Sequence, residues 1–366
     1  MDAPVIPNHL AMPPNLQRLL IVRLGSMGDI VHTLPAAFAL RQAFPEARLG
    51  WVVEERWAEL LCTISEPRSG PCSPRRPLVD RVHVVDTKLW RSALASPQTW
   101  ERAAAALSEL RALRYQIAVD FQGAIRSAML ARTSRSPVIY GFAQPWENVA
   151  SMLYSRQVDA RGGHIVEQNL SLAEAVAHRP LAMAKVEFPR DETAEKYTEA
   201  WLRREGVGEF VLMNPGAGWG AKQWPPERYA EVAQSLAQRG LQSVANFGPG
   251  EEALATAAKA ASGGTIHVIG CSLSQLIALT RRARLFIGGD TGPLHVAAAL
   301  AVPVVAIFGP TNPRRNGPFG TRNIVLRSPV SVTSHARRVA PDEGMLEITV
   351  DQVLAAAQQL AEESRG

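Results

Sequence analysis

Short apolar runs alternate with amphipathic stretches along most of the chain. Runs such as 18–24 and 210–214 have the length and aliphatic character of strands that are buried on both faces. A helical pattern follows the first run over 29–44, where Ile30, Leu34 and Phe38 recur at the spacing of one helix face. Strand and helix alternate in this way in two separate series. The pattern predicts an α/β fold with two doubly wound, mostly parallel sheets.

The two series are separated by a stretch with little periodicity, which begins near 159–163. We expect a disordered leader at 1–17, an N-terminal Rossmann-like domain at 18–160, a linker region at 161–190, a C-terminal Rossmann-like domain at 191–348 and a helix at 349–366. The final helix is amphipathic, and we expect it to pack back on the N-terminal domain. In a pair of such domains, strand carboxyl ends and helix amino ends converge on a ligand in a central cleft.

The chain has no pattern typical of a membrane span or an export signal. No uncharged apolar run reaches 18 residues, so we expect no transmembrane helix. The leader has no basic segment followed by an apolar one, so we do not expect a secretory signal. Cys62, Cys72 and Cys271 show neither a disulfide framework nor zinc spacing, which favours a reducing cytoplasm.

The net charge of +5 comes from arginine rather than lysine. The chain holds 39 lysines and arginines, and its five lysines leave 34 arginines. Arginine binds phosphate and carboxylate in a bidentate manner, so the excess suits an anionic ligand or an anionic membrane surface. Ordinary solubility with an arginine-rich composition is the alternative explanation. The sequence has no clustered basic helix, zinc finger or basic strand with interleaved aromatics, so we expect no nucleic-acid partner.

The segment 289–295, Gly-Asp-Thr-Gly-Pro-Leu-His, joins an apolar strand to a helix. Asp290 or Thr291 can cap the helix, and Gly292 lets a ligand approach the backbone. Free backbone N–H groups and the positive helix end favour an anion here, and His295 lies one turn further on. A plain helix cap needs neither Gly292 nor His295, so we interpret this turn as an anion site.

A second strand–turn–helix junction occupies 23–29, Arg-Leu-Gly-Ser-Met-Gly-Asp. Its spacing matches neither a Rossmann glycine fingerprint nor a P-loop. Asp29 can be a simple stabiliser of the helix N-terminus. It also lies where the cleft edge of the first domain is expected, and an ionised carboxylate there can accept a proton from a bound hydroxyl. The turn alone leaves both interpretations open.

The segment 214–225 places three glycines between a strand and Lys222, in a chain with few lysines. A glycine-rich loop with one lysine can bind phosphate without a metal. A flexible surface loop with a solvated lysine is the alternative.

A weaker signal is the segment 247–252, Phe-Gly-Pro-Gly-Glu-Glu, at the end of another strand. Glu251 can accept hydrogen bonds from ribose hydroxyls, although glutamate is also common in a first helical turn without a ligand. The sequence has no nucleophile constellation, HExxH, clustered carboxylates or DxD pair. We therefore expect no metal centre and no metal-bridged diphosphate.

Together, these four turns resemble those of the ADP-heptose:lipopolysaccharide heptosyltransferases, glycosyltransferase family nine, over residues 18–360. The stretches SMGDIVHTLPA and WVVEERWAEL are similar to the type I enzymes, and DTGPLHVAAAL, AKQWP and FGPT to the whole family. The resemblance implies a GT-B fold. It also implies metal-free, inverting transfer of L-glycero-D-manno-heptose from ADP-heptose to a Kdo residue of Kdo-lipid A, in the lipopolysaccharide inner core.

The resemblance implies roles for single residues. Asp29 matches the general base that deprotonates the acceptor hydroxyl, and Lys222 matches the catalytic lysine that offsets the diphosphate charge. The implied donor contacts are Gly216, Lys222, Glu251 (ribose), Cys271 (adenine), Asp290 (a sugar hydroxyl), and Thr291, Gly292 and His295 (phosphate). The implied acceptor contacts are Ser26, Met27, Gly28, Lys88, Trp90, Arg91 and Arg126.

The resemblance also implies partners and a location. The partners are ADP-heptose and Kdo-lipid A, and the enzyme is a monomer without a resident cofactor. The implied location is peripheral, on the cytoplasmic face of a Gram-negative inner membrane.

Two positions depart from the type I pattern. The loop 214–221 looks more like that of type II enzymes, and Cys271 stands where the type I enzyme packs a Met on adenine. A type II-like enzyme that adds a later heptose is the alternative within the family. A non-catalytic nucleotide-sugar-binding module and a GT-B epimerase are the alternatives outside it. Transfer needs a base in the acceptor domain, so Asp29 discriminates it from binding alone.

Overall fold

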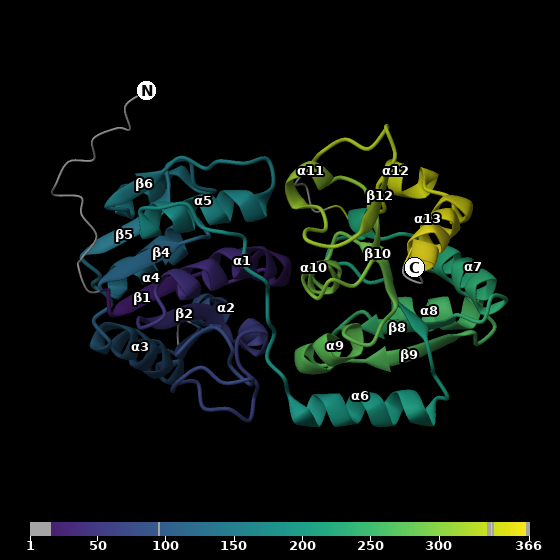
Figure 1. The fold of residues 1–366 in the computed structure, drawn as a ribbon, viewed down its shortest axis with the longest axis horizontal. Coiled ribbons are helices and arrows are strands. Elements are labelled where there is room, and N and C mark those ends of the chain that lie inside the picture. The colour runs from purple at the N-terminus through teal and green to yellow at the C-terminus, as the bar shows by residue number, and fades with distance from the viewer. Residues whose placement is uncertain (1–15, 94–95, 335–337, 339, 364–366) are drawn as a thin grey trace. The chain divides into compact units, whose positions relative to one another are not determined.

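The computed structural model describes residues 16–93, 96–334, 338 and 340–363. Residues 1–15 of the predicted leader lie outside this part of the chain. The chain divides into two units, Met1–Glu187 and Phe188–Gly366. Each unit holds one six-stranded parallel sheet with helices around it (Figure 1). The predicted α/β class is therefore confirmed.

The first unit has the strand order of a Rossmann sheet, β3-β2-β1-β4-β5-β6. Its strands are β1 (Arg18–Val22), β2 (Arg48–Glu54), β3 (Arg81–Val85), β4 (Ile117–Asp120), β5 (Val138–Phe142) and β6 (Arg156–Val158). Its helices are α1 (Met27–Ala43), α2 (Thr87–Ser92), α3 (Pro97–Ala112), α4 (Ile125–Thr133) and α5 (Ile165–Ala177), with the 3-10 helices η2 (Glu55–Leu60) and η3 (Asn148–Leu153). The order reverses between β1 and β4, and ligands bind at such switch points.

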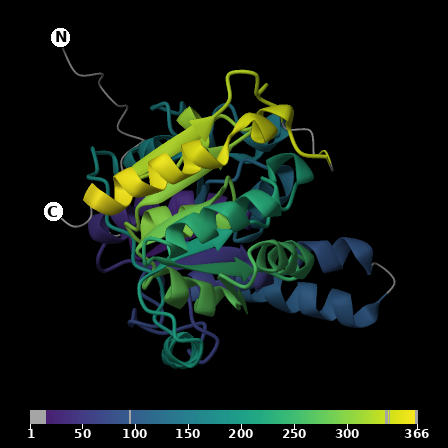
Figure 2. The ribbon, with the colours of Figure 1, turned by 90° about the vertical axis from the view of Figure 1, so that its right-hand side faces the viewer.

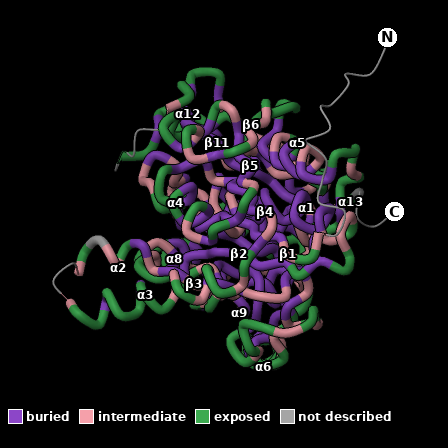
Figure 3. The backbone as a smooth tube through the Cα atoms, turned by 90° about the vertical axis from the view of Figure 1, so that its left-hand side faces the viewer, coloured by how far each residue is buried: buried purple, intermediate pink, exposed green. Residues whose placement is uncertain are grey.

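Strand β1 is buried on both faces, as its aliphatic sequence predicts. Leu19 and Ile21 point to one face of the sheet and Leu20 and Val22 to the other, because side chains alternate along a strand. All four are fully buried. Leu20 and Val22 belong to the hydrophobic cluster that α3 and α4 cover. Figure 3 shows these central strands as buried.

Helix α5 completes the first unit, although its residues fall in the region where we expected a linker. It packs along α1, and the side-chain amide of Asn169 donates to the backbone oxygen of His32 at 3.0 Å. Its apolar stripe, which includes Leu172 and Val176, is fully buried. The boundary between the units therefore falls after Glu187 rather than near residue 160.

The second unit repeats the Rossmann order as β12-β11-β10-β7-β8-β9, with its switch point between β7 and β10. Its strands are β7 (Phe210–Asn214), β8 (Gln242–Phe247), β9 (Ile266–Gly270), β10 (Leu285–Gly289), β11 (Val304–Phe308) and β12 (Asn323–Arg327). Its helices are α6 (Glu192–Arg204), η4 (Gly220–Lys222), α7 (Pro226–Ala237), α8 (Glu252–Ala261), α9 (Leu273–Thr280), α10 (Gly292–Ala299), α11 (Pro313–Asn316), α12 (Glu343–Glu347) and α13 (Val350–Glu363).

Helix α13 packs within the second unit, whereas we expected it on the N-terminal domain. It lies against α7 and the strands β10, β11 and β12 (Figure 2, yellow). Val353, Ala356 and Leu360 form its apolar stripe and are buried in the cluster beneath α7. The helix is amphipathic, as predicted, but other elements of its own unit cover the apolar stripe. Within the described residues, no helix is long and apolar enough to cross a bilayer.

Candidate active site

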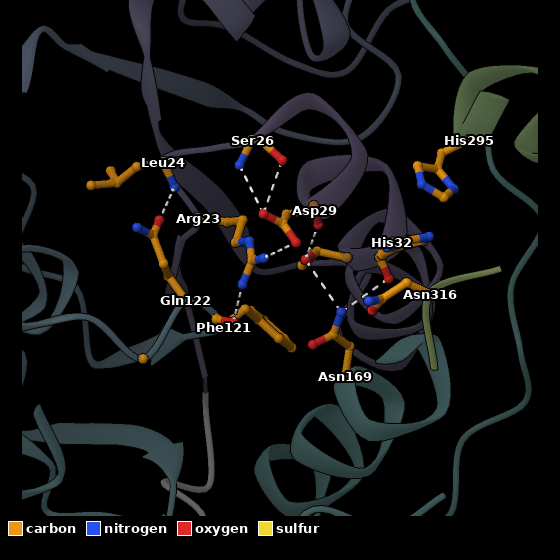
Figure 4. Close-up of polar contacts among 12 residues, drawn as sticks. Arg23, Leu24, Ser26, Asp29, His32, Phe121, Gln122, Asn169, His295 and Asn316 are labelled. Carbon is orange, nitrogen blue, oxygen red and sulfur yellow. Dashed lines mark hydrogen bonds and ion pairs between the residues drawn. The ribbon is translucent and has the colours of Figure 1, made fainter. Parts of the chain in front are cut away.

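The carboxylate of Asp29 lies at the carboxyl edge of the first sheet, in the first turn of α1. Strand β1 ends at Val22, and α1 begins only five residues later at Met27. The backbone N–H and the hydroxyl of Ser26 both donate to Oδ2 of Asp29 at 3.0 Å (Figure 4). An acid that receives bonds from the residue three positions before it closes the first turn of the helix. These bonds hold the carboxylate in one orientation.

Arg23, which is not among the predicted site residues, is a second partner of Asp29. Its Nη2 lies 2.8 Å from Oδ1 of Asp29, and its Nη1 donates to the backbone oxygen of Phe121. Arg23 is buried, whereas 44% of the Asp29 side chain is exposed. A buried guanidinium needs a counter-ion, so Asp29 has a structural role as well as an exposed carboxylate. The sequence signal for this role of Arg23 is its position directly after the apolar run 19–22.

The loops after β1 and β4 meet at the switch point of the first sheet. The backbone N–H of Leu24 donates to Oε1 of Gln122 at 2.8 Å. Asp120 holds the second loop, since it is fully buried and accepts from the hydroxyls of Ser127 (2.8 Å) and Tyr154 (2.7 Å). Burial raises the pKa of the Asp120 carboxyl in spite of these bonds. Hydrogen bonds, several of them buried, therefore hold the two loops next to the candidate base.

The predicted acceptor residues Ser26, Met27 and Gly28 share the turn of Asp29. Ser26 is exposed, Met27 is half-buried and Gly28 is buried. Ser26 contributes its hydroxyl to Asp29, so its polar atom already serves the candidate base.

The other predicted acceptor residues lie on two helices that follow strand ends. Lys88 and Trp90 are on α2, after β3, and Arg126 is in the first turn of α4, after β4. Lys88 and Arg126 are exposed, whereas Trp90 packs against the core. The side chain of Arg91 lies outside the described residues. All three described residues are in the first unit, as a shared acceptor site requires.

In the second unit, Lys222, Asp290 and His295 form a buried cluster. The Nζ of Lys222 lies 2.6 Å from Oδ2 of Asp290, and Nε2 of His295 lies 3.1 Å from Oδ1. Burial alone raises the pKa of the Asp290 carboxyl, but the hydrogen bond with His295 and the charge of Lys222 outweigh it. That pKa is therefore well below its usual range, and Asp290 is an anion at neutral pH.

This cluster supplies the contacts that Asp290 makes within the protein. Its two carboxylate oxygens face Lys222 and His295, and the contact with a sugar hydroxyl stays a prediction. Asp290 is 8% exposed. It directly follows β10, a strand inside the sheet. In this arrangement Asp290 orients the lysine and the histidine.

The turn before α10 bridges the switch point of the second sheet. Thr291 is the N-cap residue of α10, and its hydroxyl donates to Oδ1 of Asn214 at the end of β7, 3.1 Å away. Gly292 is the first helical residue. Lys222 also lies 4.7 Å from the ring centroid of Trp219, a cation–π distance. Neither Asn214 nor Trp219 has a role in the sequence-based prediction; the partner of Asn214 is 77 residues away, whereas Trp219 lies only three residues before Lys222.

Gly216 and Glu251 lie against each other. A Cβ at Gly216 would stand 2.4 Å from the carboxyl carbon of Glu251, so a larger residue there would force the Glu251 carboxylate to move. The Oε2 of Glu251 accepts the backbone N–H of Gly248 at 3.1 Å. By contrast, a Cβ at Gly218 would meet nothing within 4 Å. Of these two loop glycines, only Gly216 makes room for the glutamate.

Cys271 follows β9 at the same edge of the sheet. Its backbone N–H donates to the oxygen of Phe247 at 3.4 Å. Burial raises the pKa of its thiol to about 12, so the thiol is neutral at physiological pH. Cys271 can therefore provide a packing surface rather than a nucleophile.

The predicted donor residues form a row along one sheet edge. The order β10-β7-β8-β9 places the Asp290 turn, the loop that holds Gly216 and Lys222, then Glu251 and then Cys271 at successive carboxyl ends. Among the described residues, no group of three or more His, Cys, Asp or Glu side chains could hold a metal ion.

Known structures have the same architecture. Heptosyltransferase WaaC of E. coli with ADP matches with a TM-score of 0.75 and 27% identity, over 95% of this chain and 99% of that one. The same enzyme with ADP-2-deoxy-2-fluoro heptose matches with a TM-score of 0.72 and 26% identity, over 95% and 100%. Two Rossmann sheets and these structural matches place the chain in the GT-B class of glycosyltransferases. The predicted GT-B fold is confirmed.

Sequence comparisons place the chain within that class. The family model for glycosyltransferase family 9 (heptosyltransferase) matches residues 104–345. Lipopolysaccharide heptosyltransferase 1 of Pseudomonas aeruginosa is 30% identical, over 85% of this chain and 84% of that protein. The protein of the same name from Escherichia coli K12 is 29% identical, over 85% and 94%. The chain therefore belongs to glycosyltransferase family 9 and is an enzyme. The binding-module and epimerase alternatives are not favoured.

Proposed function

We propose that this chain transfers L-glycero-D-manno-heptose from ADP-heptose to a Kdo residue of Kdo-lipid A, in the synthesis of the lipopolysaccharide inner core. Its family and its similarity to proteins named lipopolysaccharide heptosyltransferase 1 support this activity. The observation that carries the proposal is the Asp29 carboxylate, which is firmly held yet 44% exposed. Transfer to a hydroxyl benefits from a general base, whereas binding a nucleotide sugar does not.

The donor residues follow the chemical order of ADP-heptose along the second sheet. The N-terminus of α10, with Thr291 and Gly292, receives the diphosphate, and Lys222 adds a positive charge. Glu251 accepts hydrogen bonds from the ribose, and Cys271 packs on the adenine. The diphosphate, ribose and base thus meet β10, β8 and β9 in the order of the sheet.

Asp29 and Lys222 act at opposite ends of one displacement. The acceptor oxygen attacks the anomeric carbon of the heptose while its proton passes to the Asp29 carboxylate. The bond from that carbon to the diphosphate oxygen breaks, and ADP leaves with the electron pair. Lys222 and the helix dipole stabilise the charge that develops on ADP, and Asp290 keeps the lysine in place. A single in-line displacement inverts the anomeric configuration.

On the acceptor side, Lys88, Arg91 and Arg126 pair with the carboxylates of Kdo or the phosphates of lipid A. Trp90 lies beside them, and Ser26 to Gly28 line the turn next to the base. We further propose that the enzyme is a monomer that needs no metal and works at the cytoplasmic face of a Gram-negative inner membrane.

The test is transfer from ADP-heptose to Kdo-lipid A, followed as ADP release and as a product of higher mass. A second acceptor that already carries one heptose tests the type II-like alternative. We expect turnover with Kdo-lipid A and little with the second acceptor, and none with Asp29→Ala. The proposal is wrong if the wild type releases no ADP, prefers the second acceptor, or loses nothing with Asp29→Ala.

A further inference from the structure

An apolar surface lies on α4 and η3 of the first unit. It consists of Ile125 and Met129 on α4, Trp146 in the loop before η3, and Val149 and Met152 on η3. All five side chains are exposed, Trp146 to 73% and Met152 to 80%. A contiguous apolar patch on a soluble domain usually marks an interaction site. We call these residues the α4–η3 surface.

The two elements of the α4–η3 surface are packed together. Helix α4 contacts η3, and Oε2 of Glu147 accepts the backbone N–H of Ile125 at 2.6 Å. Ile125 and Met129 are one turn apart on α4, and Val149 and Met152 are one turn apart on η3. Each pair therefore lies along one side of its element. Figure 3 shows the exposed positions of α4 in green.

The charges around the α4–η3 surface are mostly positive. Residues 121–158 contain four arginines, Arg126, Arg132, Arg135 and Arg156, and a single acidic residue, Glu147. Arg126 and Arg132 are exposed on α4 beside Ile125 and Met129. The carboxylate of Glu147 is bound to the first turn of α4, so it is partly neutralised by the helix N-terminus.

We propose that the α4–η3 surface docks the protein on an anionic lipid bilayer. Tryptophan, methionine and isoleucine side chains can enter the headgroup region, while arginines at the rim bind lipid phosphates. The long aliphatic stem of arginine lets its charge stay at that level. A protein partner or a second copy of the chain would not by itself require a rim of one charge.

The position of the surface fits a lipid-linked acceptor. Helix α4 follows β4, and the loop after β4 contacts the loop that leads to Asp29 through Gln122 and Leu24. A glycolipid held in the bilayer beneath α4 would therefore present its sugar at the edge of the sheet that carries the candidate base. This consequence rests on the proposed function, whereas lipid binding itself does not.

The experiment measures sedimentation of the full chain with vesicles that contain neither acceptor nor ADP-heptose. We expect binding to phosphatidylglycerol/phosphatidylcholine vesicles at least about tenfold stronger than to phosphatidylcholine alone. The double variant Trp146→Ser/Met152→Ser should weaken binding about tenfold, and Arg132→Gln about fivefold at low salt. The matched control is Val330→Ser/Val332→Ser, which changes two exposed valines of the second unit and should bind like the wild type.

Several results would overturn docking on lipid. The proposal is wrong if the wild type does not bind anionic vesicles more strongly than neutral ones. It is also wrong if Trp146→Ser/Met152→Ser or Arg132→Gln binds these vesicles as strongly as the wild type. A wild type that is dimeric by light scattering and becomes monomeric in the double variant would show a subunit interface instead. Circular dichroism checks the fold of each variant. Vesicle binding without heptose transfer would refute the proposed function and leave the docking surface intact.

Discussion

Replacing Lys222 with methionine will separate its structural contribution from its part in the chemistry. Its Nζ lies 2.6 Å from Oδ2 of Asp290, and the two side chains are only 16% and 8% exposed. Methionine keeps most of the apolar stem but removes the charge. The Asp290 carboxylate then depends on its hydrogen bond with His295.

The expected loss of stability follows from the burial of the Lys222–Asp290 ion pair. Removing one partner of a buried ion pair destabilises a protein by about 3–5 kcal/mol. His295 remains, so we expect the lower end, about 3 kcal/mol, or a fall of about 6–12 °C in the Tm of the second unit. The pKa of Asp290 is lower in the folded protein than in the unfolded chain, where it is about 3.9. The ion pair therefore stabilises the fold fully at pH values above the unfolded pKa, and this contribution is lost as the pH falls toward the folded pKa. The difference between wild type and variant should therefore be full at pH 7 and shrink below about pH 4.

Calorimetry of a double-mutant cycle provides the measurement. Asp290→Asn in the Lys222→Met background removes the uncompensated charge and should recover at least about half of the lost stability. Both variants should still lack transfer, since the diphosphate has lost its cation. Lys259→Met, on an exposed lysine of α8, should change stability by less than about 0.5 kcal/mol. Wild-type Tm in Lys222→Met, or a full second loss on adding Asp290→Asn, would refute the reasoning.

Three further predictions concern the candidate base in the first unit, the donor residues in the second unit and the charge on ADP. Arg23→Met removes the ion pair that orients Asp29, so kcat should fall about 10- to 100-fold at constant KM for ADP-heptose; steady-state kinetics would contradict this if only KM rose. Gly216→Ala drives a Cβ into Glu251 and should weaken ADP binding about tenfold by titration calorimetry. Gly218→Ala, with open space around its Cβ, is the control, and equal losses in both would count against a role for Glu251. EDTA should leave the transfer rate unchanged, because Lys222 and α10 meet the diphosphate charge; loss of activity that magnesium restores would show a metal requirement.

Much of the fold could be predicted from the sequence because its strands are short aliphatic runs. Strands β1 and β7 lie inside their sheets, so their residues are apolar on both faces and the pattern is clear. The packing partners of amphipathic helices were harder to predict. The sequence patterns of α5 and α13 show an apolar stripe but not which surface covers it. In the structure, each stripe is covered by other elements of the unit to which its helix belongs. The three-residue strand β6, at a sheet edge, has too few residues for a periodic signal.

The sequence points to single candidate site residues but not to the contacts that they make. Asp29 and Lys222 stand out locally because each follows a strand and a glycine turn. Their partners depend on tertiary structure: Lys222 meets Asp290, 68 residues away. Arg23 lies near Asp29 in sequence, but its role depends on burial against the backbone of Phe121. Separation along the chain hid the Lys222–Asp290 pair, and the burial of Arg23 hid the Arg23–Asp29 pair.

The direct test of the central claim compares Asp29→Asn with the wild type. Asparagine keeps the shape of the side chain but is not a base, while calorimetry reports separately on ADP binding in the other unit. We predict that kcat for transfer to Kdo-lipid A falls about 10²- to 10⁴-fold while the Kd for ADP is unchanged. A variant that retains transfer within about threefold of the wild type would show that Asp29 is only the counter-ion of Arg23.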